Sequence, residues 1–313
     1  MTIKQEKRLQ NSINALLDSY KNHPEIEHIS DITLPAKENI ITLLEDLQVL
    51  LFPGLIRQES FDNLNLPHLI GQQTVSIYYR LKDAIEQVLC WKATEEGKNC
   101  NEKQDFGKQV ESITFELLEY LPQLRGILSE DVDAILSGDP ASVSKREIVL
   151  AYPGLQAVSV YRIANFLHKR NVPLLPRIMT EYMHSKTGID IHPGVSIGKG
   201  FMIDHGTGIV IGETTIIKDQ VRLYQGVTLG ALSPQNSLAN PNLKRHPTIE
   251  SNVIVYSGAT ILGDVIIGED SIIGGNVWIT NDIPAQSRVF LKNITSGQEI
   301  IKKQNKANSK KTN

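Results

Sequence analysis

The sequence predicts an α+β protein in which an all-helical N-terminal domain precedes a left-handed parallel β-helix of hexapeptide repeats. Two observations support this class. Before residue 185 apolar residues recur at helical spacing, and after it an aliphatic residue returns at every sixth position. The repeat slips by two residues once and is interrupted once by a long segment: Ile191, Ile197, Ile203, Ile209; then Ile211, Ile217, Leu223, Leu229; then Ile249, Val255, Ile261, Ile267, Ile273 and Ile279.

The helical domain is expected over residues 1–185. The first twenty residues have the pattern of a polar amphipathic helix, and a second helix around Ile40–Leu51 ends before Pro53-Gly54. Proline and polar segments separate the further helices, which are predicted over 66–91, 107–121, 129–137, 143–151, 154–170 and 173–186. We read Pro122 as a break between two of them.

The β-helix is expected over residues 186–294. Each six-residue unit forms one short strand and a corner, and three units close one triangular turn. The aliphatic residue points inward and buries itself against the next coil, so stability is built coil on coil. Glycine often follows it, where crowding at the corner or an unusual φ excludes a Cβ: Gly198, Gly212, Gly230, Gly268 and Gly274. The lysine-rich residues 295–313 are predicted to be a disordered tail.

Composition restricts the functional class. The 313 residues carry a formal net charge of −3 and 21 % charged residues, which indicates neither a nucleic-acid partner nor a membrane surface. The chain lacks an apolar run long enough to span a bilayer, and its polar start does not resemble a signal peptide. Cys90 and Cys100 give no disulfide framework. We therefore expect a cytoplasmic protein.

The two irregularities of the repeat carry the candidate chemistry. The segment between Leu229 and Ile249 must leave the prism as a loop, and it delivers Arg245 and His246. The other irregularity follows the inward Ile203, where Asp204 and His205 lie at a widened corner and can face outward.

At these residues the chain resembles the serine O-acetyltransferases. The resemblance is carried by DIHPGVSIGKGFMIDHGTGIVIGET, by VTLGA and by KRHPTI, and upstream by Asp139-Pro140-Ala141. It covers residues 115–290 well and the first 110 weakly. It implies transfer of the acetyl group of acetyl-CoA, as co-substrate, to the hydroxyl of L-serine, giving O-acetylserine in cysteine biosynthesis. No metal is implied.

The resemblance assigns His205 as the general base and Asp190 as the carboxylate that orients it. An imidazole suits this task, because its ordinary pKa of ~6.5 leaves it able to accept a proton near neutral pH. His246 would place the hydroxyl or stabilise the oxyanion. Asp190 and His205 are nearly one coil apart, so their proximity is plausible from spacing but not shown by it.

Substrate recognition follows the charges of serine. The guanidinium of Arg245 can hold the carboxylate through two parallel hydrogen bonds. Asp139 and Asp204 match the family positions that face the ammonium group. By resemblance the pantetheine arm of coenzyme A lies between neighbouring coils, at Gly230, Ala231, Ser257 and Gly275.

The resemblance also implies partners. The prism itself is expected to form a homotrimer with the active site between subunits, because one of its three flat faces is left free to pack. The resemblance implies that the helical half joins two trimers and that cysteine is an inhibitor that competes with serine. Relatives that dock cysteine synthase do so through a terminal isoleucine, whereas this sequence ends Lys311-Thr312-Asn313. That complex is therefore not supported. Ala231 also departs from the glycine common in the family.

Three alternatives use the same prism. Another hexapeptide O-acetyltransferase, acting on a sugar or antibiotic hydroxyl, needs no grip on a zwitterion. A metal-dependent hydratase needs three histidines converging on zinc, and His192, His205 and His246 are widely spaced. A non-catalytic scaffold would not need His205. We interpret His184 and His192 as structural residues.

Overall fold

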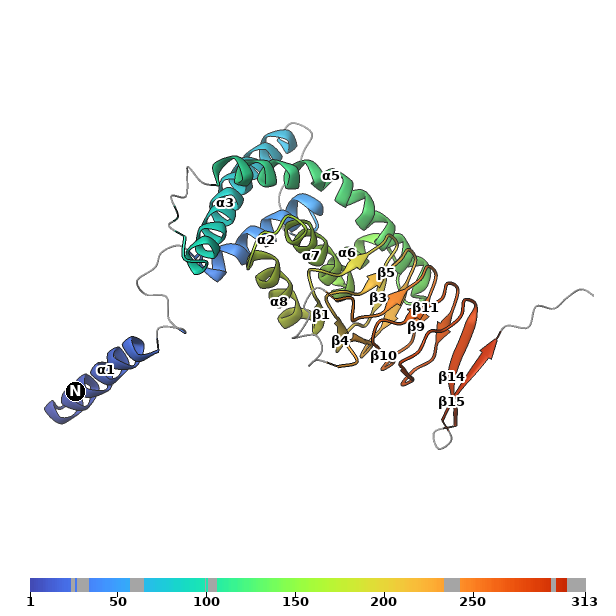
Figure 1. The fold of residues 1–313 in the computed structure, drawn as a ribbon. Coiled ribbons are helices and arrows are strands. Elements are labelled where there is room, and N and C mark those ends of the chain that lie inside the picture. Colours follow the sequence, from blue (N-terminus) through green and yellow to red (C-terminus); the bar gives the residue numbers. More distant parts are fainter. Residues whose placement is uncertain are drawn as a thin grey trace, which may run out of the picture.

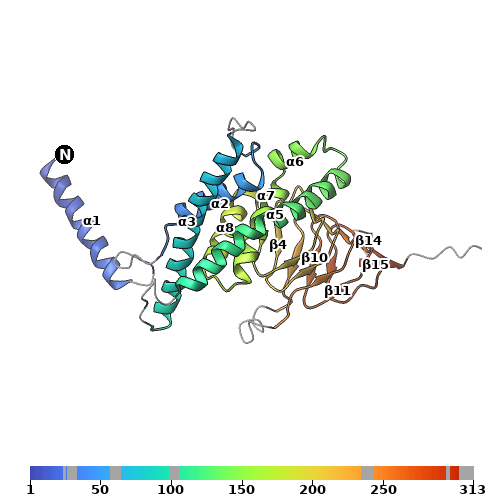
Figure 2. The same cartoon turned by 90° about the horizontal axis from the view of Figure 1, so that it is seen from above.

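Seven helices precede the strands in the part of the chain that the structure describes, a computed structural model covering residues 1–23, 26, 34–56, 65–98, 100, 106–233, 243–293 and 297–302 (Figure 1). The helices are α1 (Ile3–Asn22), α2 (Lys37–Leu51), α3 (Leu66–Glu95), α5 (Gly107–Gly138), α6 (Lys145–Ala151), α7 (Pro153–His168) and α8 (Leu175–Thr187). α1 lies apart from the other elements in two views, and none of its residues is buried (Figures 1 and 2). Among the described helices, none is long and apolar enough to cross a bilayer.

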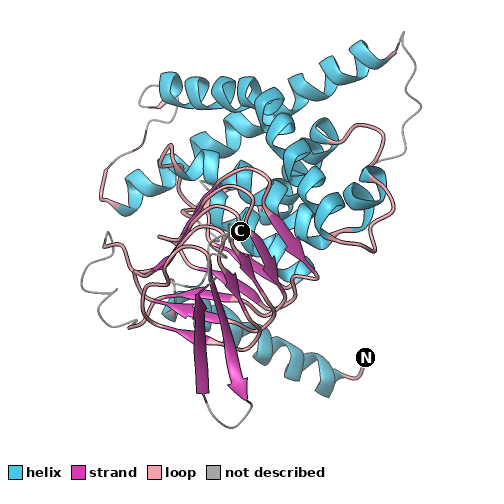
Figure 3. Ribbon diagram, turned by 90° about the vertical axis from the view of Figure 1, so that its right-hand side faces the viewer, coloured by secondary structure: helices cyan, strands magenta, loops and turns pink. Residues whose placement is uncertain are grey.

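Short strands follow α8 and wind into a parallel β-helix, with the helices other than α1 gathered on one side of it (Figures 1 and 3). They are β1 (Ile189–Ile191), β2 (Ser196–Ile197), β3 (Met202–Asp204), β4 (Ile209–Ile211), β5 (Ile216–Ile217), β6 (Arg222–Tyr224), β7 (Thr228–Gly230), β8 (Thr248–Ile249), β9 (Ile254–Val255), β10 (Thr260–Leu262), β11 (Ile266–Ile267), β12 (Ile272–Ile273), β13 (Trp278–Ile279), β14 (Ser287–Asn293) and β15 (Gly297–Lys302). The predicted class, helices followed by a parallel β-helix of hexapeptide repeats, is confirmed.

The prism has three faces, which the chain visits in turn. Face A is β1-β4-β7-β10-β13, face B is β2-β5-β8-β11, and face C is β3-β6-β9-β12-β14 with β15 at its edge. We name each corner by the faces it joins. The C/A corner therefore follows β3, β6, β9 and β12, and the A/B corner follows β1, β4, β7 and β10.

The register explains the period of six. Ile191, Ile211 and Leu229 are successive partners on face A, and the same alignment continues through Ile261 to Ile279. These residues are all buried in the core of the prism. The glycines that follow the inward residues are needed for space. At Gly198, for example, an added Cβ would lie 2.3 Å from Oδ1 of Asp219.

Helix α7 covers the open end of the first coil. Asn165 donates to the carbonyls of Pro193 (2.7 Å) and Val195 (2.8 Å), and Tyr161 donates to Val195 as well. Arg162 donates to the Gly198 carbonyl at 2.7 Å and forms a buried pair with Asp131. These hydrogen bonds satisfy carbonyls that the solenoid would otherwise leave unpaired. The helical half is thereby joined to the prism.

Two predicted helix boundaries were wrong. Residues 107–121 and 129–137 belong to one helix, α5, with Pro122 inside it. Proline removes one backbone hydrogen bond, yet α5 has buried apolar residues on both sides of it, among them Leu117, Leu121, Leu124 and Leu128. The packing of these residues on both sides of Pro122 outweighs the free-energy cost of the missing backbone hydrogen bond.

The two cysteines, for which the sequence indicated no disulfide framework, are paired in the structure. Cys90 and Cys100 form a disulfide with their Cα atoms 5.5 Å apart. α3 continues to Glu95 and carries Cys90 in its buried face, and the chain then returns to bring Cys100 beside it.

The predicted disordered tail includes a strand. β15 pairs antiparallel with β14, which would otherwise be the open edge of face C. Residues 294–296 and 303–313 lie outside the described residues.

Candidate functional site

His205 lies at the C/A corner of the first coil. β3 ends at Asp204, and His205 follows in the left-handed region with φ 57°. Its side chain is 70 % exposed, and its Nδ1 is 3.8 Å from Oδ1 of Asp204. Gly206 then turns the chain where an added Cβ would meet Ile189 at 2.5 Å. The two extra residues of this corner therefore present His205 outward, as predicted.

Asp139 reaches the same corner from the end of α5. Its Oδ2 accepts a hydrogen bond from the Tyr152 hydroxyl at 2.6 Å, and its Oδ1 accepts one from the Ala141 amide at 2.8 Å. These hydrogen bonds, led by that of Tyr152, lower the pKa of Asp139, and the charge of His205 lowers it further. The structure thus groups three predicted residues, Asp139, Asp204 and His205.

Aromatic side chains continue this corner along the prism. Tyr224 is the register partner of Asp204, and its ring stacks on that of Tyr256 at 5.1 Å. Burial and the nearby Asp204 carboxylate raise the pKa of Tyr224. Beyond it Ser257 and Gly275 lie in adjacent coils, where an added Cβ on Gly275 would be 3.0 Å from the Ser257 carbonyl oxygen.

Arg245 and His246 lie at the A/B corner, where Thr214 holds both. Its Oγ1 accepts the amide N–H groups of Arg245 (2.9 Å) and His246 (3.1 Å). The Thr214 amide donates to Nδ1 of His246 at 3.1 Å, and its hydroxyl is 2.9 Å from the same nitrogen. One threonine from the preceding coil therefore positions the end of the long loop.

His246 is held as a neutral imidazole. Its side chain is 7 % exposed, and burial, with a contribution from Arg245, lowers its pKa to about 4. Because Nδ1 accepts from a backbone amide, Nε2 carries the proton and is available as a donor. Gly212 permits this placement, since a Cβ there would lie 2.2 Å from the imidazole.

The Arg245 guanidinium forms an ion pair with Glu213, and Lys244 pairs with Asp264 at 3.1 Å. Both basic side chains are thus paired with carboxylates. Glu213 thereby fixes the orientation of the planar guanidinium of Arg245.

A cavity of about 420 Å³ opens at this A/B corner. Its lining includes Asp190 and Ala231 together with Arg245 and His246. Gly230 immediately precedes Ala231 at the end of β7. His192 also lines it, and its Nδ1 accepts the Gly194 amide at 3.0 Å. Burial lowers the pKa of His192.

The predicted site residues therefore fall into two groups on the two edges of face A. The outward residues of that face lie in register between them: Asp190, Val210, Thr228, Thr260 and Trp278. Val210 is 40 % exposed and Trp278 is 60 % exposed. A face with exposed apolar side chains therefore separates His205 from Arg245.

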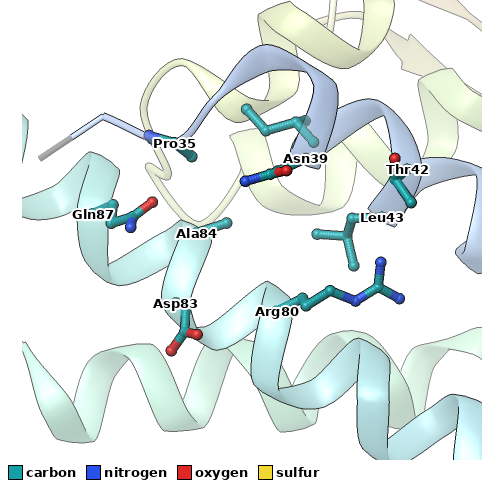
Figure 4. A pocket seen from close by; sticks show the side chains of 9 residues that line it. Pro35, Asn39, Thr42, Leu43, Arg80, Asp83, Ala84 and Gln87 are labelled. Atoms are coloured by element: carbon teal, nitrogen blue, oxygen red, sulfur yellow. The ribbon is translucent and has the colours of Figure 1, made fainter. Parts of the chain in front are cut away.

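Two other features of the described residues have polar groups that could bind a ligand. A cavity of about 300 Å³ lies between α2 and α3, where Asn39, Arg80, Asp83 and Gln87 line it without a histidine (Figure 4). Separately, ligand atoms of Glu181, His184 and Asp190 lie within 4.8 Å of one another and could hold a metal. Glu181 already forms an ion pair with Arg177, which would compete with a metal ion.

Sequence reasoning did not single out Tyr152, Glu213 or Thr214. The last two stand in the GIVIGET run that carries the resemblance, so their position offered a signal. Tyr152 gave none, because its contact with Asp139 depends on how α5 and α7 meet.

Comparison with known proteins gives consistent matches. Residues 246–281 match the family described as bacterial transferase hexapeptide (six repeats). A plasmid serine acetyltransferase of Synechococcus elongatus is 39 % identical over 266 residues, covering 84 % of this chain and 83 % of the relative. Serine acetyltransferase isoform 3 of Entamoeba histolytica, solved in complex with cysteine, has a TM-score of 0.68 at 32 % identity and covers 93 % of this chain and 94 % of that one. A serine acetyltransferase in complex with CoA has a TM-score of 0.52 at 25 % identity, covering 84 % of this chain and 100 % of that one.

Proposed function

The chain belongs to the serine acetyltransferase family, and we propose that its C/A and A/B corners form one active site when subunits assemble. The enzyme is an acyltransferase that transfers the acetyl group of acetyl-CoA to the hydroxyl of L-serine, giving O-acetylserine. The observation that carries the proposal is the placement of His205 and Arg245 on opposite edges of face A.

The division of labour follows from the chemistry. His205 accepts the proton of the serine hydroxyl as its oxygen attacks the thioester carbonyl. The Nε2–H of His246 donates to the oxyanion of the tetrahedral intermediate. Collapse breaks the C–S bond, and the imidazolium of His205 returns the proton to the departing thiolate of coenzyme A.

Substrate recognition uses both corners. Arg245 binds the serine carboxylate, and Asp139 and Asp204 face its ammonium group. The protein holds these side chains in place. Arg245 forms an ion pair with Glu213, and Asp139 accepts hydrogen bonds from Tyr152 and Ala141.

A threefold assembly brings these groups together. If three prisms turn face A toward a common axis, the C/A corner of one subunit adjoins the A/B corner of the next. The exposed Val210 and Trp278 would then be buried, and Asp190 of the neighbouring subunit could reach His205. Coenzyme A would lie in the same groove, with Ser257 and Gly275 on one wall and Gly230 and Ala231 on the other.

We assign the remaining parts accordingly. Residues 1–185 form the oligomerisation domain that joins two trimers, and residues 186–294 form the acyltransferase domain. The enzyme acts in cysteine biosynthesis in the cytoplasm. Cysteine, which has SH where serine has OH, competes with serine for the same three charged side chains; a relative was solved in complex with cysteine.

Mixed oligomers test the shared site. Subunits with His205→Ala and subunits with His246→Ala are each expected to be nearly inactive, but oligomers formed by co-expressing the two contain interfaces with both intact corners. Thiol release from acetyl-CoA with L-serine should therefore recover in purified mixed oligomers. Absence of recovery, with mixed assembly verified by two affinity tags, would place the complete site in one chain.

Substrate scope and control need two further assays. L-serine should support thiol release, whereas galactosides and chloramphenicol should not. Initial rates against serine at several cysteine concentrations should show competitive inhibition. Inhibition that serine cannot relieve would place cysteine at a separate site.

A further inference from the structure

We propose that Tyr152 is a positioning residue of the serine subsite, which holds the Asp139 carboxylate toward the Asp204–His205 corner and so sets the affinity for the substrate's ammonium group. This inference rests on the proposed function, because it assumes that Asp139 faces the ammonium. It adds a residue that lies outside the repeat and outside the motifs that carry the family resemblance.

Both oxygens of the Asp139 carboxylate are held by the protein. The Tyr152 hydroxyl donates to Oδ2 at 2.6 Å, and the Ala141 amide donates to Oδ1 at 2.8 Å. With one hydrogen bond on each oxygen the carboxylate plane is fixed, yet each oxygen keeps a further lone pair. An ammonium group can therefore be received in a defined direction.

Tyr152 occurs at this position because two helix ends rest directly on β3. It is the N-cap residue of α7, and Gly154 in the first turn is so close to the prism that a Cβ would lie 2.4 Å from the Ile203 carbonyl oxygen. Gly138, at the end of α5, approaches as closely: a Cβ there would lie 2.4 Å from Sδ of Met202. Asp139 and Tyr152 thus meet beside the strand that ends in Asp204.

The hydrogen bond between Tyr152 and Asp139 keeps the tyrosine hydroxyl protonated and the carboxylate ionised. Donation to Asp139 raises the pKa of Tyr152 to about 12, with a smaller contribution from Asp204. The same hydrogen bond is the largest cause that lowers the pKa of Asp139. Tyr152 therefore remains a protonated donor and Asp139 remains ionised throughout the working pH range. A phenol held in this way orients a carboxylate and does not act as the base.

Tyr152→Phe removes the hydroxyl and keeps the ring. The Oδ2 oxygen loses its partner, and the carboxylate can rotate away from the ammonium position. A hydrogen bond to a charged group contributes enough binding free energy that its loss should raise the KM for serine about tenfold. The Ki for cysteine should rise by a similar factor. The KM for acetyl-CoA should stay within about twofold, because the proposed function places that ligand against Ser257 and Gly275 and not against Asp139.

A double-mutant cycle tests whether Tyr152 acts through Asp139. The full-length enzyme is compared with Tyr152→Phe, Asp139→Ala and the double variant, by kcat and KM for each substrate. Tyr152→Phe should raise the serine KM in the native background and change it less than about twofold in the Asp139→Ala background. Equal effects in both backgrounds would overturn the proposal, since Tyr152 would then act independently of Asp139.

The chain offers a matched control. Tyr182 donates to Glu45 at 3.0 Å, so Tyr182→Phe removes a tyrosine–carboxylate hydrogen bond away from the corner. Its serine KM should be unchanged. If Tyr182→Phe raised the serine KM as much as Tyr152→Phe does, the effect of Tyr152→Phe would be explained by a general loss of structure, and the positioning role would be refuted.

The outcomes separate this inference from the proposed function. If the native enzyme released no thiol with serine, the proposed function would fail first. If Asp139→Ala left the serine KM unchanged, the assignment of Asp139 would be wrong. If Asp139→Ala raised it and Tyr152→Phe did not, the inference about Tyr152 alone would be rejected.

Discussion

The two corners that flank face A are built in different ways. At the C/A corner Asp139 and Tyr152 arrive from the ends of α5 and α7 and meet a turn of the prism. At the A/B corner Arg245 and His246 are held by side chains of the preceding coil, Glu213 and Thr214. The first depends on docking of the helical half, and the second is a local clamp within the repeat. Substitutions at one corner should therefore leave the geometry of the other intact.

The largest expected effect is at the C/A corner. His205→Ala should lower kcat by roughly 10²–10⁴-fold, the usual worth of a positioned general base. His205 is 70 % exposed in the chain, so the fold should be unaffected by its loss. Steady-state kinetics and circular dichroism measure the two quantities. An unchanged kcat would move the base to His246.

At the A/B corner, Arg245→Lys should raise the KM for serine about tenfold or more and that for acetyl-CoA much less. Lysine keeps the charge but cannot form two parallel hydrogen bonds with a carboxylate, each worth about 1.5–3 kcal/mol when charged. Equal changes in both KM values would indicate that Arg245 contacts coenzyme A instead.

The clamp itself is tested by Thr214→Val, with Thr214→Ser as its matched control. Valine leaves two backbone amides without their acceptor, which at about 1–3 kcal/mol predicts a loss of about tenfold in kcat/KM for serine. Serine retains the hydroxyl and should stay near the native value. If Thr214→Val kept the native kcat/KM, or if Thr214→Ser lost as much as Thr214→Val, the hydrogen bonds to the Thr214 hydroxyl would not be what holds the site.

The smallest effect concerns pH. The pKa of His246 is about 4 in the folded protein, against ~6.5 in an unfolded chain. The unfolded state therefore binds more protons between these values, and stability falls as the pH decreases through this range. His246→Asn should show a shallower fall in Tm between pH 6.5 and 4. His205→Asn, at the exposed corner, is the control, and a fall as steep in His246→Asn as in the native enzyme would contradict the assignment.

The periodic part of the fold could be read from the sequence because it is repeated. A residue such as Ile261 is buried wherever its coil lies, since the same inward position recurs in the coils above and below it. The outward histidine of the widened corner and the arginine of the long loop were predicted for the same reason: both interrupt a known register. Helix α5 was predicted as two helices because Pro122 has a low helix propensity. In the structure the burial of apolar residues along the whole helix outweighs that local preference.

What the sequence determined by itself is the prism, the order of helices before it and the identity of the charged residues at its corners. Only the tertiary structure decided how these residues are grouped: Asp139 with His205, and Asp190 with Arg245 and His246. The physical reason is that spacing along the chain predicts the coil and the face on which a residue lies. It does not predict which residues from other elements pack against it. Those approaches depend on contacts without a periodic signal, such as Gly154 against the Ile203 carbonyl and Gly212 against His246.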